Sequence, residues 1–176
     1  LYTAREELLH AGTHGLGAFL SLGALIFMVS RALVNGEPLQ ILVAVMFGVS
    51  MVALYSASTL YHAWTKPDTK AFLKTCDHVA IYWLIAGSYT PFVVITVGGT
   101  LGWSVFALIW ALAIGGTIFE LVTKGKRMKL ALGFYLAMGW LSVVFIGRLI
   151  DLLPATGMVF LVAGGVLYTV GAAFYA

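Results

Sequence analysis

Three polar side chains lie where the second long apolar run of the chain gives way to the third. Ser58 and His62 close the run LQILVAVMFGVSMVALYSASTLYHAW, and Asp77 follows shortly after it. Ser58 and His62 are four residues apart, so they share one face of a helix. An imidazole can ligate a metal ion, and a hydroxyl and a carboxylate beside it can orient the imidazole or a metal-bound water. The structural alternative is that His62 packs and that Asp77 caps the third helix.

The remaining histidines are His10, His14 and His78, and we expect all four on one side of a membrane. His10 and His14 are four residues apart, a spacing that lets two imidazoles chelate zinc from one helix. The alternative, which suits a helix entrance better, is that they face lipid headgroups. For Glu120, we expect the carboxylate to extend toward Lys124 at the same side of the membrane.

The composition is that of a membrane protein. Hydrophobic residues make up 61% of the 176 residues and charged residues only 10%, whereas a soluble domain carries about a quarter charged residues. Six apolar segments are long enough to span a bilayer. They run approximately over residues 12–34, 39–64, 75–97, 101–122, 130–149 and 156–176. We therefore expect one all-α domain, residues 1–176, that forms a polytopic bundle of spanning helices, with a kink at Pro91 in the third.

Lysine and arginine are distributed unevenly between the two sides of this bundle. The amino-terminal side, with the second-to-third and fourth-to-fifth connections, carries eight of the ten basic residues. Because cytoplasmic loops carry an excess of Lys and Arg, this predicts a cytoplasmic amino terminus, and we expect the plasma membrane. The cluster KGKRMK suits contact with anionic lipid better than contact with nucleic acid. The expected partners are therefore membrane lipids and not nucleic acid.

Several stretches together resemble the haemolysin III family, which is related to the progestin and adipoQ receptors. They are REELLHAGTHGLG, SASTLYHAW and CDHVAIYWLIAGSYTPF, in an order and spacing that cover nearly the whole chain. The hydrophobic layout agrees through six helices. The matching positions that can do chemistry are Glu7, His14, Ser58, His62, Asp77 and Tyr89.

The resemblance implies a bundle of seven helices with a zinc ion near the cytoplasmic face. In that pattern His62 is a zinc ligand, Ser58 and Asp77 flank the metal and its water, and two histidines of the seventh helix complete the site. Glu7, His14 and Tyr89 are accessory candidates. No histidine follows His78 in this sequence. We therefore expect that the sequence ends before a seventh helix; the alternative is that this member has lost the remaining metal ligands.

Three functions are compatible with these residues. The first is a zinc-dependent hydrolase that cleaves a lipid amide or ester, with Asp77 and Ser58 as catalytic groups. The second is a non-catalytic sensor or regulator of membrane state that holds a structural zinc. The third is a pore-forming cytolysin, which is disfavoured because the middle portions of the helices are almost wholly apolar.

Overall fold

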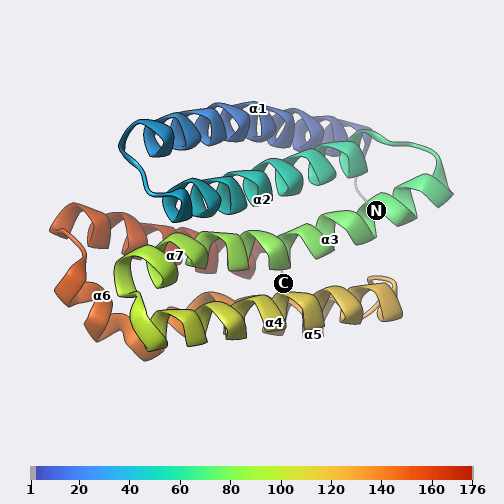
Figure 1. Ribbon diagram of the computed structural model, residues 1–176. Coiled ribbons are helices and arrows are strands. Elements are labelled where there is room, and N and C mark those ends of the chain that lie inside the picture. Colours follow the sequence, from blue (N-terminus) through green and yellow to red (C-terminus); the bar gives the residue numbers. More distant parts are fainter. Residues whose placement is uncertain (1–2, 176) are drawn as a thin grey trace.

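The computed structural model describes residues 3–175, and every regular element within them is helical (Figure 1). The α-helices in chain order are α1 (Ala4–Asn35), α2 (Pro38–Ala63), α3 (Pro67–Thr90), α4 (Gly99–Thr123), α5 (Met128–Gly139), α6 (Ile146–Leu152) and α7 (Ala155–Tyr175). A π-helical segment, η1 (Pro91–Val97), extends α3, and a 3₁₀ segment, η2 (Trp140–Phe145), joins α5 to α6. The predicted all-α class is confirmed.

Six stretches of the described chain are long and apolar enough to cross a membrane. They are Ala4–Val34, Pro38–Ala63, Pro67–Val97, Gly99–Thr123, Met128–Leu152 and Ala155–Phe174. Each contains most of one predicted segment, so the expected number and order of spans are confirmed. The protein is a multi-pass membrane protein with six candidate spans.

The first and third helices begin earlier than the apolar runs alone predict. A capping box starts α1, since the Thr3 hydroxyl accepts from the N–H of Glu6 and the Glu6 carboxylate accepts from the N–H of Thr3. In α3 the first residue is Pro67, whose missing N–H costs nothing at that position. Asp77 therefore lies ten residues inside α3. The interpretation of Asp77 as a helix cap is wrong.

The helix does not simply end at Pro91. Proline has no N–H to donate, so the regular hydrogen-bond ladder is interrupted there. The chain continues in a wider register, in which the N–H of Gly98 donates to the carbonyl of Val93 at 3.0 Å. The predicted interruption of the third span is thus a π-helical segment, of a kind that often occurs at functional sites.

Helix α3 is the centre of the bundle. It packs against α2 on one side and α4 on the other, and α1 packs against α2 (Figure 1). In the most apolar window of the α3–η1 span 50% of the residues are buried, compared with 0% in α7. The inner surface is closed by Tyr82 and Val93 of the α3–η1 span together with Ile109 and Ala113 of α4, all fully buried.

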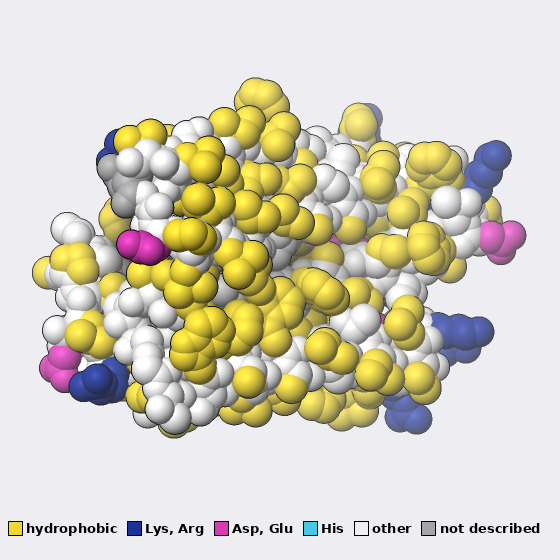
Figure 2. All heavy atoms as spheres, viewed as in Figure 1, with side chains coloured by type: hydrophobic (Ala, Val, Ile, Leu, Met, Phe, Trp, Pro, Cys, Tyr) yellow, Lys and Arg dark blue, Asp and Glu magenta, His cyan; other side chains and the backbone are white. Residues whose placement is uncertain are grey.

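Most of the outer surface is apolar, with basic side chains gathered at one end. Large exposed hydrophobic side chains occur on every spanning helix, a surface that would aggregate in water but suits a lipid environment. Figure 2 shows hydrophobic side chains between the two ends of the bundle and Lys and Arg mainly at the right-hand end. We call this the basic end. Its basic residues are Arg5, Lys66, Lys70, Lys74, Lys124, Lys126, Arg127 and Lys129.

Candidate functional site

His62, in the last turn of α2, is held by a carboxylate from α1. Its Nδ1 lies 2.8 Å from Oε2 of Glu7, and the two side chains are 10% and 21% exposed. A carboxylate only accepts hydrogen bonds, so this contact places a proton on Nδ1. In the neutral imidazole the lone pair then belongs to Nε2. A carboxylate on one ring nitrogen is the usual arrangement around a histidine that ligates a metal through the other.

Glu7 also joins α3 to this contact. Its second oxygen, Oε1, lies 2.9 Å from Nζ of Lys70. The same ammonium donates to the carbonyls of Tyr61 and Trp64 at the end of α2, at 3.1 and 3.2 Å. Lys70 therefore connects α3 both to Glu7 and to the last carbonyls of α2. Lys70 was not predicted as part of the site, because the apolar runs alone place it in the connection before the third helix.

The two histidines of α1 face the same point. The centre of the His10 ring lies 4.9 Å from the centre of the His62 ring. The His14 ring also stacks on the His62 ring, at 5.8 Å and with an interplanar angle of 6°. His10 and His14 thus face α2, whereas the alternative interpretation had them facing only lipid headgroups. Within residues 3–175, however, no three His, Cys, Asp or Glu side chains are grouped so as to hold one metal ion.

Ser58 and Asp77 meet beside this histidine cluster. Ser58 is buried in α2, and its hydroxyl lies close enough to the Asp77 carboxylate of α3 to interact with it. His14, His62 and His78 are all close enough to act electrostatically on that carboxylate. The structure therefore brings Ser58, His62 and Asp77 to one depth, next to Glu7 and His14. Their chemical roles stay predictions.

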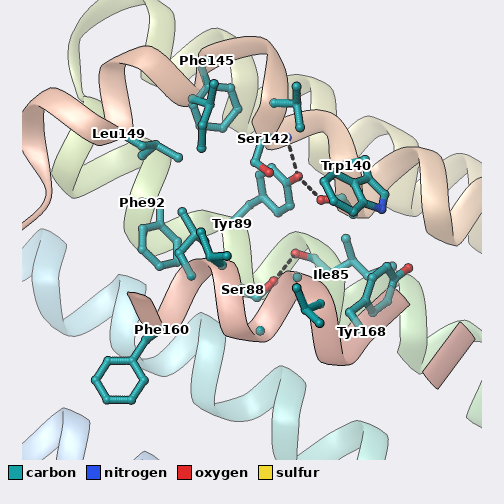
Figure 3. A pocket seen from close by; sticks show the side chains of 18 of the residues that line it. Ile85, Ser88, Tyr89, Phe92, Trp140, Ser142, Phe145, Leu149, Phe160 and Tyr168 are labelled. Atoms are coloured by element: carbon teal, nitrogen blue, oxygen red, sulfur yellow. Dashed lines mark hydrogen bonds between the residues drawn. The ribbon is translucent and has the colours of Figure 1, made fainter. Parts of the chain in front are cut away.

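Tyr89 lies elsewhere on α3, twelve residues beyond Asp77. Its hydroxyl donates to the carbonyl of Gly139 at 2.8 Å and accepts from the N–H of Ser142 at 2.7 Å (Figure 3). These bonds occupy backbone groups where α5 passes into the 3₁₀ segment η2. Tyr89 thereby ties α3 to that junction and lines a cavity that is separate from the histidine cluster.

That cavity has a volume of about 570 Å³ and opens between α3, η1, η2, α6 and α7. Its walls are mainly apolar, with hydroxyls from Ser88, Tyr89 and Tyr168 (Figure 3). The Tyr168 hydroxyl is buried, and within the described residues it has no hydrogen-bond partner. The lining of α3 begins at Ile85, roughly 12 Å along the helix from Asp77 at about 1.5 Å per residue.

Glu120 does not extend toward Lys124 as expected. It is 1% exposed, and its Oε2 lies 3.5 Å from Nδ1 of His78. The expectation is wrong because α4 turns this carboxylate toward α3 and not toward the surface.

Comparison with known proteins decides the family. A family model described as Haemolysin-III related matches residues 2–176. The chain belongs to the haemolysin III-related family. The resemblance predicted from the sequence is confirmed.

Relatives of this haemolysin III-related chain occur in bacteria and mammals. It is 44% identical to Hemolysin-3 of Bacillus cereus over 97% of its own length and 78% of the relative. It is 42% identical to a Hemolysin-3 homolog of Bacillus subtilis (strain 168), over 99% and 82%. It is 28% identical to the monocyte to macrophage differentiation factor of Homo sapiens, over 98% and 72%. No solved structure matches it.

Proposed function

We propose that this protein is a zinc-dependent hydrolase of a lipid amide or ester, with its reacting centre at the basic end of the bundle. The observation that carries the proposal is the convergence of His62, Ser58 and Asp77 at one depth, with Nδ1 of His62 held by a carboxylate at 2.8 Å. Ionisable groups at membrane depth are costly and are retained mostly where they have a function.

The donor chemistry at His62 fits zinc, because Glu7 leaves the Nε2 lone pair for a ligand bond. A catalytic zinc takes three protein ligands. His62 is one, and the described residues are not arranged to supply the other two. When bound, zinc would polarise the carbonyl of the substrate and lower the pKa of a bound water toward ~7.

Asp77 and Ser58 have separate roles in the proposed reaction. Asp77 accepts the proton of the attacking water and returns it to the leaving amine or alcohol, which keeps the proton balance of hydrolysis. Ser58 has a single hydroxyl hydrogen, so a hydroxyl that donates to Asp77 cannot also donate to an oxyanion. The proximity of the two side chains therefore supports Ser58 as the group that orients Asp77, with oxyanion donation only after the hydroxyl rotates.

The apolar cavity supports a lipid as the substrate. A volume of about 570 Å³ with mainly apolar walls is typical of a pocket for a small apolar ligand. The cavity begins roughly 12 Å along α3 from Asp77, at about 1.5 Å per residue, on the side away from the basic end. Tyr89 is an accessory residue in this arrangement, since it shapes the cavity wall.

The experiment combines metal analysis with turnover. Purified protein in lipid nanodiscs is analysed for zinc by mass spectrometry and is incubated with a panel of lipid amides and esters. We expect stoichiometric zinc and release of fatty acid, loss of both in His62→Ala, and loss of turnover with zinc retained in Asp77→Asn. Absence of zinc from the protein, or turnover that survives both substitutions, would refute the proposal.

A second candidate function is a non-catalytic sensor of membrane state. The observation that favours it is the chain of contacts Lys70–Glu7–His62, which links three helices and could report on their separation. In that case metal binding depends on His62 while no lipid in the panel is cleaved. Ion flux through protein-containing liposomes would instead indicate the cytolytic role that the name Hemolysin-3 suggests.

The proposed orientation places the basic end in the cytoplasm and the protein in the plasma membrane. It follows from the eight basic residues at that end against two at the other. A membrane-impermeant thiol reagent tests it on the single cysteine, Cys76. We expect labelling in inside-out vesicles and none in intact cells, and the reverse result would invert the topology.

A further inference from the structure

A buried ionisable pair lies beside the site described above. Nδ1 of His78 in α3 and Oε2 of Glu120 in α4 are 3.5 Å apart, and the side chains are 4% and 1% exposed. Within the described residues, His78 is the only basic side chain at ion-pair distance from Glu120. A carboxylate this deep is expensive unless it is paired. Apolar packing alone therefore does not explain why a carboxylate occupies the position of Glu120.

The pair is set into the antiparallel contact between α3 and α4. His78 and Tyr82 are four residues apart on α3, and Gly116 and Glu120 are four apart on α4, so each pair shares one helix face. Gly116 lies against the ring of Tyr82, where an added Cβ would overlap the ring. The contacts 78–120 and 82–116 thus define one register between the helices.

A third helix completes the surroundings of the pair. The Tyr135 hydroxyl of α5 donates to the backbone carbonyl of His78 at 3.0 Å, and its ring lies 4.5 Å from that of Tyr82. Gly125, in the turn between α4 and α5, lies beside both His78 and Glu120 and has a positive φ of 67°. The pair therefore joins α3 to α4, to α5 and to the turn between them.

His78 is also the neighbour of Asp77 in sequence. Successive residues of an α-helix point about 100° apart, because a turn contains 3.6 residues. Asp77 faces Ser58 of α2, whereas His78 faces Glu120 of α4. The rotation of α3 about its axis thus sets both contacts at once.

We propose that His78 and Glu120 are positioning residues that fix the rotation of α3 and so hold the Asp77 carboxylate against Ser58. The consequence for metal binding rests on the proposed function; the mechanical claim does not. Without Glu120, the α3 side chains at this level keep the contact of Asp77 with α2 but lose the contact of His78 with α4, and the bond from Tyr135 holds only the backbone of His78. The alternative is that the pair only attaches α4, with no effect on the surroundings of Asp77.

Cys76, the only cysteine of the chain, is a native reporter beside Asp77. Its exposure is intermediate, so rotation of α3 changes its rate of reaction with a maleimide. The full protein in nanodiscs is compared with Glu120→Gln, His78→Gln and the double variant. The matched control is Thr117→Val, which removes the acceptor of the 3.0 Å bond from Trp83 on the same α3–α4 contact.

We expect either single variant to change the labelling rate of Cys76 several-fold and to weaken zinc binding by about tenfold, the lower end of the loss seen for residues that support metal ligands. The double variant should label more like the wild type, because two neutral amides can hydrogen-bond to one another. Thr117→Val should lower stability without either effect.

The outcomes separate this inference from the proposed function. If Thr117→Val changes labelling as much as Glu120→Gln does, or if Glu120→Gln leaves labelling unchanged, the positioning role is refuted whatever the metal content. If wild-type protein binds no zinc while labelling still responds to Glu120→Gln alone, the proposed function fails and the positioning role stands. Zinc affinity that is identical in wild type and Glu120→Gln would confine the pair to a mechanical role and overturn its link to the site.

Discussion

Replacing Glu7 by glutamine tests whether the negative charge of Glu7 holds α1, α2 and α3 together at the candidate site. The substitution keeps the shape of the side chain and removes its charge from two contacts, 2.8 Å to His62 and 2.9 Å to Lys70. Breaking a fully buried ion pair costs about 3–5 kcal/mol, and losing an exposed pair about 0–1 kcal/mol. Glu7 and Lys70 are 21% and 24% exposed and His62 is 10% exposed. We therefore expect an intermediate loss of about 2 kcal/mol.

The assay is equilibrium unfolding in mixed detergent micelles, followed by circular dichroism. The matched control is Glu6→Gln, one residue earlier on α1, where the carboxylate is exposed and accepts hydrogen bonds from Thr3. Its expected effect is within about 0.5 kcal/mol of wild type, as for most surface substitutions. A double-mutant cycle with Lys70→Gln should give less than the sum of the single losses.

The same variant separates stability from metal chemistry. If the negative charge of Glu7 supports His62 as a metal ligand, zinc affinity should fall by about 10–100-fold in Glu7→Gln and remain unchanged in Lys70→Gln. Equal losses of stability in Glu6→Gln and Glu7→Gln would refute the energetic reasoning. Unchanged zinc affinity in Glu7→Gln would refute the claim that the negative charge of Glu7 supports His62 as a metal ligand.

Three further substitutions test the packing and the cavity. Gly116→Ala should cost about 1–3 kcal/mol because its Cβ would overlap a tyrosine ring of α3, whereas Gly115→Ala, with nothing within 4 Å, should be neutral or stabilising in the same unfolding assay. Tyr168→Phe removes a buried hydroxyl that has no partner within the described residues, so we expect unchanged or raised stability, and a clear loss would reveal a missing partner. Gly165→Leu should fill the cavity and weaken retention of a single-chain lipid measured by mass spectrometry, while Gly171→Leu, outside its lining, should not.

The spanning helices could be predicted from the sequence because each is a long apolar run bounded by charge or by turn residues. Their starts were harder. Pro67 and the polar residues after it look like a connection, yet they form the first turns of α3 because proline suits the first helical position. Hydropathy marks where lipid contact begins and not where the helix begins. For the same reason the sequence placed Asp77 near a helix start, while the structure places it well inside α3.

Within the candidate site, neighbours on one helix could be predicted from the sequence, whereas partners on different helices could not. Ser58 and His62 could be grouped from their spacing, because residues four apart on one helix are neighbours whatever the tertiary packing. The partners on other helices depend on how each helix is rotated about its axis, and near-uniformly apolar helices give little signal for that rotation. The contact of Glu7 with His62 depends on the rotation of the helices in this way, and so does the orientation of His10 toward α2. The pairing of Glu120, which lies 42 positions after His78, depends on it as well.

Helix rotation also explains why polar residues gather on α3 near the basic end. A helix that contacts lipid on one side can rotate at little cost, because most of its faces are equally apolar. Half of the most apolar window of α3 is buried, and on its polar turn Asp77 faces α2 while His78 faces α4. Two polar contacts about 100° apart leave one rotational setting in which both are satisfied. Any other setting leaves a carboxylate without a partner in a low-dielectric interior, where each unpaired charge is heavily penalised. The polar turn of α3 therefore fixes the geometry of the candidate site more firmly than the apolar packing around it does.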